Sequence, residues 1–562
     1  MNVKRLPIRR AVTLTMTISL CVPLFVAQIS AASADTTTKA GQVAAPVPSL
    51  EWHSCGAGLE RFECTTAEVP TDYDEPSGAT TTIAVTKLPA TDPDARIGSL
   101  FTNPGGPGGS GVDFLHSAGL TSYTDEVRAR FDIIGFDPRT VSRSDPATCF
   151  ASPEEEQDEL AKHLPFPMTT TEEYEFLGLN ARLAANCRMT SADRFAHAST
   201  ANVARDMDLL RQAVGDEELT YMGYSYGTAL GATYARLFPD RIRALALDGA
   251  FPPSKYTGRP GDEDVSMGVR IDQGEGAAET FDQFLRTCAE AGPQRCELAA
   301  LGDPTTVVEE MLERLKTDPV TIALPDGTEV AIDYPTAVAV SFSSLYHPGD
   351  WTGLAQMLAQ LVTAEETFSG AGAELAERLV HDNITTRRRH NDYPSAGGAM
   401  APMCADSGTT GQPFAYPEMA DDAAESAPHF GRYRAWVGVS CEFLRVTDDD
   451  AYTGPWDQEI DEPVLVIGTR FDPATPYFNT EPFAERFDNA HVLTIEGYGH
   501  TGLGKSVCAD AAISNYLIDL DVPEDGATCE QDVKPFETST AGDDHRITTP
   551  FRPTPLLPAI TR

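Results

Sequence analysis

The chain has 562 residues, of which 41% are hydrophobic and 22% charged, and its 84 acidic and 42 basic side chains give a formal net charge of −42. This composition excludes an intrinsically disordered chain, because it holds ample apolar material for a large core. So negative a field also repels phosphate backbones and anionic lipid surfaces, so we expect no nucleic-acid partner. The length fits either several domains or one large α/β domain that carries an insertion.

The first 34 residues have the pattern of a secretory signal peptide. Basic residues precede an apolar run over residues 11–29, and Ala32-Ser33-Ala34 offers the small residues that a signal peptidase requires. The alternative is an uncleaved membrane anchor, since the run approaches the roughly 20 residues that span a bilayer. We favour cleavage after Ala34, which predicts a secreted, extracellular protein with no stable membrane insertion.

Ten cysteines follow the predicted cleavage site, an even number that is typical of disulfides formed in an oxidising compartment. No pair has the CxxC spacing of a metal site, and we expect no bound metal. We favour pairing in sequence order, which closes short loops such as Cys55 to Cys64 and Cys288 to Cys296. The sequence alone leaves the connectivity open.

Apolar, β-branched runs alternate with amphipathic segments through the first half of the chain. The predicted strands cover residues 81–87, 98–102, 131–136, 219–222 and 242–247. The predicted helices cover residues 202–214 and 226–237. Strands that alternate with helices indicate a parallel sheet.

Two further strands, at 463–468 and 491–495, follow after a gap of more than 200 residues. The gap has helical patterns at 277–291, 305–316, 337–346, 351–364 and 373–380, then a Gly-, Ser- and Pro-rich stretch near 394–427. The predicted fold is therefore α/β, with a mainly parallel sheet and a large, mostly helical lid inserted after the sixth strand. The expected division is 1–34 signal peptide, 35–252 first part of the core, 253–455 lid, 456–536 C-terminal part of the core and 537–562 extended tail.

A candidate nucleophile, Ser225, stands at the centre of the sequence GYSYG at 223–227. This motif joins the predicted strand 219–222 to the predicted helix 226–237, and a serine on such an elbow is held in a strained turn that exposes its hydroxyl. Outside this context the motif would be an ordinary Gly/Ser turn. The context favours a catalytic serine.

A nucleophilic serine needs a base that a carboxylate orients. Asp472 follows the strand 463–468, and His500 follows the last predicted strand within GYGH. Both stand at C-terminal strand ends, where α/β sheets place their sites, and the chain order serine, acid, histidine is that of the G-x-S-x-G hydrolases. Asp248, at the end of strand 242–247, is the alternative acid. If Asp248 has no catalytic role, we expect it to cap the turn at Asp248-Gly249.

The reaction also needs N–H donors for the developing oxyanion. The loop NPGGPGGSG at 103–111 follows the strand 98–102, and its glycines leave backbone amides unshielded. We expect the amides of Gly106 and of Tyr226, the residue after the nucleophile, to form the oxyanion hole. A phosphate-binding loop is the other interpretation, but no GK[ST] follows the glycines, and we expect no cofactor.

These motifs carry a resemblance to a known family. The chain resembles the secreted bacterial tripeptidyl-aminopeptidase-like α/β-hydrolases, relatives of the proline iminopeptidases, through NPGGPGGSG, FDPR at 136–139, GYSYG, CAD at 404–406, GTRFDPATP at 468–476 and GYGH. The likeness implies an exopeptidase that removes short peptides, expected to be tripeptides, through an acyl-enzyme. It also implies that Ser225, Asp472 and His500 match the family triad. The expected partners are peptides with free amino termini, and we expect a monomer.

Two positions depart from the usual pattern of the family, and one aspartate is a candidate for substrate binding. After the FDPR motif the family usually has glycines, whereas this chain has Thr140 and Ser142, so we expect the local turn to differ. Asp406, after Cys404, is the predicted anion for the substrate's ammonium group, and its distance from Ser225 would set the length released. The alternative for Asp406 is an exposed or turn-capping aspartate.

Two other functions are compatible with the same residues. A carboxylesterase acting on short acyl esters would use the same triad and oxyanion hole. A catalytically inert binding protein on this fold would be expected to have a broken triad, whereas all three members are present. The leading hypothesis is the secreted serine exopeptidase.

Overall fold

The computed structural model describes residues 45–258, 261–262, 264–323, 329–364, 369–376, 395–457 and 459–537. The predicted signal peptide and almost all of the predicted tail lie outside these ranges. Within them, we find no helix with the length and apolarity that a membrane span requires.

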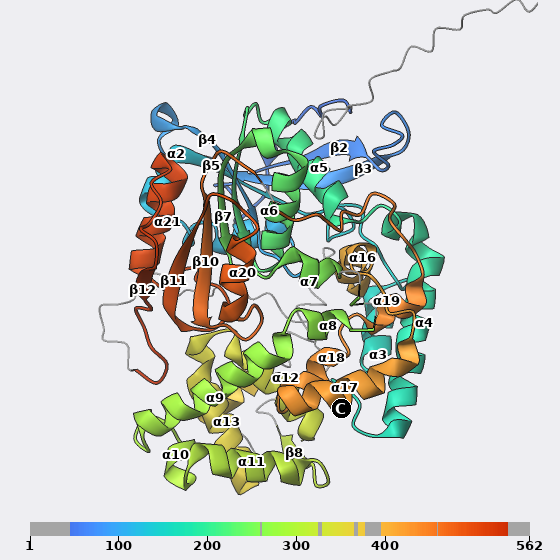
Figure 1. The fold of residues 1–562 in the computed structure, drawn as a ribbon, viewed down its shortest axis with the longest axis vertical. Coiled ribbons are helices and arrows are strands. Elements are labelled where there is room, and N and C mark those ends of the chain that lie inside the picture. Colours follow the sequence, from blue (N-terminus) through green and yellow to red (C-terminus); the bar gives the residue numbers. More distant parts are fainter. Residues whose placement is uncertain are drawn as a thin grey trace, which may run out of the picture. The chain divides into compact units, whose positions relative to one another are not determined.

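Ten strands form one sheet. They are β1 (His53–Ser54), β2 (Glu63–Pro70), β3 (Thr80–Leu88), β4 (Gly98–Asn103), β5 (Phe131–Phe136), β6 (Leu219–Tyr224), β7 (Ile242–Asp248), β10 (Val464–Phe471), β11 (Ala490–Tyr498) and β12 (Ala527–Glu530). Their order is β1-β2-β3-β5-β4-β6-β7-β10-β11-β12 (Figure 1). The pairs from β5 to β12 are parallel, whereas β1, β2 and β3 form an antiparallel edge that joins β5. The mainly parallel sheet confirms the predicted fold class.

Every predicted strand is present, and the sheet has three more, β1, β2 and β12. Their signals in the sequence are weak, because β1 has only two residues and β2 contains Glu63, Glu68 and Pro70, residue types that strands disfavour. Counted with these edge strands, β7 is the seventh strand along the chain. The insertion predicted after the sixth strand follows β7.

Side chains of the central strands alternate between two buried faces. On one face Leu245 and Leu247 of β7 belong to a cluster with α5 (Thr200–Ala213), α6 (Tyr226–Leu237) and α20 (Thr480–Ala484). On the other face Ala244 and Ala246 belong to a cluster with α1 (Gly111–Ala118), α2 (Asp125–Arg130) and α21 (Val507–Asp519). Helices cover both faces of the sheet in this way, so the central strands β4 to β7 and most of β10 are buried, which holds their C-terminal ends in place (Figure 1).

The insertion between β7 and β10 is mainly helical. Its helices are α7 (Pro253–Thr257), α8 (Met267–Arg270), α9 (Gln273–Ala291), α10 (Leu298–Leu301), α11 (Pro304–Leu315), α12 (Tyr334–Leu345), α13 (Trp351–Thr363), α16 (Ala396–Asp406), α17 (Tyr416–Ser426), α18 (Phe430–Ala435) and α19 (Val439–Leu444). A two-stranded hairpin, β8 (Val320–Ala323) and β9 (Glu329–Ile332), accompanies them. The predicted helix at 373–380 lies only partly within the described residues.

A second part of the chain packs with these helices. It comprises α3 (Pro153–Leu160) and α4 (Thr170–Phe195), which lie between β5 and α5. Phe176 of α4 belongs to the same apolar cluster as α9 and α12, and Leu183 of α4 belongs to a cluster with α16 and α19. We call α3, α4 and the helices of the insertion together the cap. The predicted division placed residues 35–252 in the core, whereas α3 and α4 from that range pack with the cap. The predicted domain boundaries themselves stay a proposal.

Five disulfides join the ten described cysteines in sequence order, which confirms the predicted pairing. They are Cys55–Cys64, Cys149–Cys187, Cys288–Cys296, Cys404–Cys441 and Cys508–Cys529. Three of them act on the cap. Cys404–Cys441 links α16 to α19, and Cys288–Cys296 joins α9 to the segment before α10. Cys149–Cys187 ties α4 to the loop after β5.

The turn after the FDPR motif forms without glycine. Thr140 and Ser142 have φ of 71° and 48°, in the left-handed region that costs a residue with a side chain about 1 kcal/mol or more. The buried Arg139 stabilises the turn through its ion pair with Asp206, whose Oδ1 lies 2.6 Å from Nη2. Thr140 and Ser142 thus adopt left-handed conformations at the positions where the family usually has glycines; whether the turn itself differs from that of the family stays a prediction.

Candidate active site

Ser225 stands at the junction of β6 and α6, with φ 56° and ψ −124°. This backbone conformation is strained for any residue other than glycine. The Ser225 N–H donates to the Asp248 carbonyl oxygen at 2.9 Å, and the two flanking glycines permit the close turn. A Cβ on Gly223 would lie 2.5 Å from the Gly227 carbonyl oxygen, and one on Gly227 would lie 2.7 Å from the Asn103 carbonyl oxygen. The GYSYG motif therefore folds as a strand-to-helix elbow.

His500 and Asp472 meet at the C-terminal ends of β11 and β10. His500 Nδ1 lies 2.9 Å from Oδ2 and 3.0 Å from Oδ1 of Asp472. Oδ1 of Asp472 also accepts from the N–H groups of Ala474 and Thr475, and Oδ2 accepts from the N–H of Thr501. Burial by itself raises the pKa of Asp472, but the charge of His500 and these hydrogen bonds outweigh it and hold the pKa below its usual value. The carboxylate therefore stays ionised at neutral pH and can stabilise an imidazolium.

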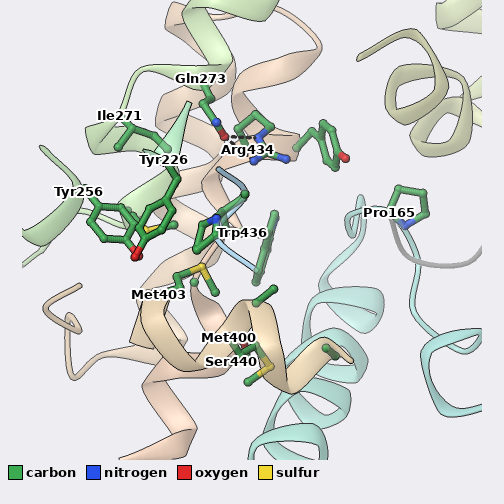
Figure 2. Close-up of a pocket in the computed structure, with 18 of the residues that line it drawn as sticks. Pro165, Tyr226, Tyr256, Ile271, Gln273, Met400, Met403, Arg434, Trp436 and Ser440 are labelled. Carbon is green, nitrogen blue, oxygen red and sulfur yellow. Dashed lines mark hydrogen bonds between the residues drawn. The ribbon is translucent and has the colours of Figure 1, made fainter. Parts of the chain in front are cut away.

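Ser225 and His500 line one cavity of about 280 Å³, to which the sheet and the cap both contribute. Figure 2 shows the cap side of this cavity, where Met400, Met403 and Trp436 are among the lining residues. Within the described chain Ser225 Oγ makes no hydrogen bond to His500. In a hydrolase without substrate this contact is often long and shortens when substrate binds.

The glycine-rich loop after β4 packs against the elbow. Gly105 and Gly106 have φ of 90° and 116°, and a Cβ on Gly105 would lie 2.4 Å from the Tyr224 carbonyl oxygen and 2.9 Å from the Tyr226 nitrogen. Tyr226 is the first residue of α6, where an N–H has no partner inside the helix. Among the described residues neither this N–H nor that of Gly106 has a hydrogen-bond acceptor. Both predicted oxyanion donors are therefore free.

Asp248, the alternative acid, does not hydrogen-bond to His500. Its Oδ2 accepts from the Gly502 N–H at 2.8 Å, and its Oδ1 has no hydrogen-bond partner in the described part of the chain. Burial raises the pKa of Asp248 to about 7. This geometry favours Asp472 as the residue that orients His500.

Three residues that sequence reasoning did not single out also contact His500. Lys505 Nζ donates to the His500 carbonyl oxygen at 2.9 Å, and Tyr346 accepts from the His500 N–H with its carbonyl oxygen at 2.9 Å. Thr475 Oγ1 lies 3.3 Å from His500 Nδ1 and donates to Asp472 at 2.9 Å. Thr475 stands in the GTRFDPATP motif, which was its only signal. Tyr346 belongs to the Leu345-Tyr346 pair, which is a further part of the resemblance to the family, but that pattern gave it no role at the site. Nothing in the sequence pattern distinguishes Lys505.

Asp406 ends α16 and is only 3% exposed. Its carboxylate accepts from the N–H and the hydroxyl of Thr200, and that hydroxyl also bonds to the Tyr226 hydroxyl. Asp406 does not line the cavity, so the structure does not bring it together with Ser225 and His500. Its role as the anion for the substrate's ammonium group stays a prediction.

We expect the Asp406→Asn protein to be more stable than the wild type at pH 8 but not at pH 4. Burial raises the pKa of Asp406 from 3.8 to about 7, so the folded state binds this proton more tightly than the unfolded state. The resulting stability is complete below the unfolded pKa and is lost as the pH rises through 7, by on the order of a few kcal/mol. Asparagine keeps an oxygen for the Thr200 N–H and adds no charge.

Urea unfolding of both proteins at pH 4, 6 and 8 measures this difference. Asp248 also has a raised pKa, so the variant should keep part of the wild-type pH dependence. Equal pH dependence in the two proteins would contradict the prediction. The same variant tests the ammonium role, because an unchanged KM for peptides with a free amino terminus excludes it.

The fold and the strand-end constellation define the class of this protein, a serine hydrolase of the α/β-hydrolase fold. Residues 100–294 match a family model described as alpha/beta hydrolase fold, and residues 427–529 match one described as TAP-like protein. The serine protease Hip1 of Mycobacterium tuberculosis is 31% identical over 508 residues, which cover 85% of this chain and 91% of that protein. The chain therefore belongs to the TAP-like family of α/β-hydrolases, as the sequence motifs predicted.

Relatives in this family carry different names. Carboxylesterase B of Mycobacterium tuberculosis is 30% identical over 512 residues, covering 87% of this chain and 92% of that protein. The tripeptidyl aminopeptidase of Streptomyces coelicolor is 27% identical over 501 residues, covering 86% of this chain and 87% of that protein. Membership of the family thus establishes a serine hydrolase. It does not define the substrate, for which the residues that line the cavity must be considered.

Proposed function

We propose that the protein is a secreted serine exopeptidase that releases short peptides, expected to be tripeptides, from free amino termini. The observation that carries the proposal is the shared cavity, in which cap residues such as Trp436 and Met403 stand together with Ser225. A cavity limited by a cap admits the end of a chain and restricts how much of it passes the serine. The relatives named tripeptidyl aminopeptidase and serine protease support peptide substrates. The five disulfides support an oxidising compartment.

In the proposed mechanism Ser225 Oγ attacks the carbonyl carbon of the scissile bond and its proton passes to Nε2 of His500. Asp472, held at Nδ1, stabilises the imidazolium that forms. The oxyanion accepts hydrogen bonds from the N–H groups of Gly106 and Tyr226. His500 then gives the proton to the leaving amine, and a water hydrolyses the acyl-enzyme by the same route in reverse.

A carboxylesterase is the second candidate, and one observation favours it. The described residues that line the cavity include no carboxylate, and most of them are apolar, among them Phe176, Leu183, Phe251 and Met400. Such a lining suits the acyl chain of an ester as well as it suits apolar peptide side chains. The relative named carboxylesterase B is consistent with it.

Product analysis separates the two candidates. The purified protein is incubated with an unblocked decapeptide, with its N-acetylated counterpart and with short p-nitrophenyl esters, and the products are followed by mass spectrometry. We expect fragments of about three residues from the amino end of the unblocked peptide only. The Ser225→Ala protein should release none and should resist labelling by a fluorophosphonate, because its nucleophile is gone.

Faster cleavage of the acetylated decapeptide would contradict the aminopeptidase proposal. Rapid ester hydrolysis without any peptide product would establish the carboxylesterase instead. Fluorophosphonate labelling that persists in Ser225→Ala would place the nucleophile elsewhere.

A further inference from the structure

The cavity that holds Ser225 contains a cation, Arg434 of α18. In a protein whose formal net charge is −42, the described lining of this cavity has no carboxylate, and Arg434 is the only arginine or lysine in it. Figure 2 shows the Arg434 guanidinium at the cavity wall beside Gln273, the first residue of α9. The local charge is therefore opposite to that of the protein as a whole.

Neighbouring groups hold the guanidinium in place without neutralising it. Its Nε and Nη2 both donate to Oε1 of Gln273, a neutral acceptor, with Nε at 3.0 Å. Its Cζ lies 4.8 Å from the ring centroid of Phe342 and 5.1 Å from that of Tyr433, distances at which aromatic faces stabilise a cation. No carboxylate of the described chain lies within ion-pair distance of it. The full positive charge is thus available to a ligand.

The neighbouring Arg432 of the same helix differs from Arg434, because carboxylates neutralise its charge. Its Nη2 lies 2.5 Å from Glu173 Oε1, and its other amino group pairs with Asp421. A half-buried charge in an apolar cavity is costly unless it is paired. Arg434, two residues further on, has no such partner, so an anion that enters the cavity would offset this cost.

Arg434 also acts close to the reacting groups. Arg434 and Tyr346 both line the cavity, and the positive charge of Arg434 opposes the rise that burial causes in the pKa of Tyr346. The Tyr346 ring in turn packs edge-on against the His500 ring, with centroids 4.9 Å apart. An acyl group on Ser225 would therefore share its cavity with the guanidinium.

We propose that Arg434 binds a carboxylate carried by the acyl part of the substrate, which in a peptide is the side chain of an Asp or Glu within the released piece. The inference rests on the proposed acyl hydrolysis by Ser225 and adds a substrate class to it. Gln273 positions the guanidinium, and an arginine offers a carboxylate charge-assisted hydrogen bonds that a neutral isostere does not receive.

Matched substrates test the proposal. Three tripeptidyl p-nitroanilides carry Glu at one of the three positions and Ala at the others, and each is paired with the Gln equivalent. A p-nitrophenyl hydrogen glutarate and the ester of glutaramic acid form an analogous pair for ester hydrolysis. We expect wild-type kcat/KM to favour the acid over the amide by about tenfold to hundredfold in at least one pair.

The Arg434→Gln protein should bring that ratio close to one, because the acidic substrate loses charge-assisted hydrogen bonds that the amide never makes. Arg236→Gln is the matched control, because Arg236 is also half-buried and bonds a neutral acceptor, the Tyr452 hydroxyl, outside the cavity lining. The control should keep the wild-type ratio. Fluorophosphonate labelling of Ser225 reports whether each variant has a formed site.

A wild-type ratio at or below one in every pair would overturn the proposal, as would an unchanged ratio in an Arg434→Gln protein that still labels. Should Arg434→Gln fail to label, Arg434→Lys decides, since a retained charge should preserve part of the preference and a ratio of one would overturn it. Absence of anilide cleavage in all proteins contradicts the exopeptidase function instead, and the glutarate pair then still tests Arg434.

Discussion

The Asp472→Asn enzyme should turn over its substrate about 10⁴-fold more slowly than the wild type, whereas Asp248→Asn should lose less than tenfold. Asparagine at 472 offers an N–H₂ to Nδ1 of His500 in place of an acceptor, which favours the wrong tautomer and removes the charge that stabilises the imidazolium. At 248 the carboxyl has no hydrogen bond to His500, and burial already raises its pKa to about 7, so a neutral amide is a small change. Steady-state kcat for the two variants makes the comparison.

Thermal unfolding of both variants shows whether the loss is catalytic. We expect Asp472→Asn to unfold cooperatively near the wild-type temperature, because the amide oxygen can still accept from the backbone N–H groups of Ala474 and Thr475. A larger loss of kcat in Asp248→Asn than in Asp472→Asn would reverse the assignment of the acid.

The Gly105→Ala protein should lose about 10²- to 10³-fold in kcat and on the order of 3 kcal/mol in stability. The added Cβ would lie 2.4 Å from the Tyr224 carbonyl oxygen, so the oxyanion loop or the elbow must move. Displacement of one oxyanion donor costs about that factor in kcat. The stability loss combines overpacking with a side chain at φ of 90°.

Gly215→Ala separates the clash from the backbone strain. Gly215 also has φ of 90°, but a Cβ there meets nothing within 4 Å. We therefore expect it to cost about 1 kcal/mol and to leave kcat unchanged. Equal kinetic losses in the two variants would mean that the approach of Gly105 to the elbow does not matter for the reaction. Guanidinium unfolding and kcat on the same preparations provide both readouts.

The sheet could be predicted because strong local patterns decide it. The runs at 131–136 and 226–237 match β5 and α6 to the residue, since each is apolar or amphipathic over its whole length and ends in a charged or glycine-rich segment. By contrast, the Gly-, Ser- and Pro-rich stretch near 394–427 contains α16 and α17. Gly397, Gly398 and Pro402 lower the helix propensity of α16, and packing against α4 and α19 overrides it.

For the site, the sequence predicts the catalytic residues but not the surroundings of Asp406 and Arg434. Ser225, Asp472 and His500 each directly follow or nearly follow a strand, so the order of the motifs along the chain was enough to predict that they converge. The surroundings of Asp406 depend on Thr200 and Tyr226, which come from the core more than 175 residues away along the chain. Arg434 is placed by contact with Gln273 and Phe342, on two other cap helices. No local pattern encodes such contacts between distant segments.

The two-part cap has a consequence for how this family diversifies. Its apolar cluster is made almost wholly of cap residues, so a substitution at Trp436 or Phe176 reshapes the cavity without disturbing the strand ends that carry Ser225 and His500. Substitutions in the cap can therefore change the substrate preference without changing the catalytic residues. This agrees with a family whose members carry names as different as serine protease and carboxylesterase.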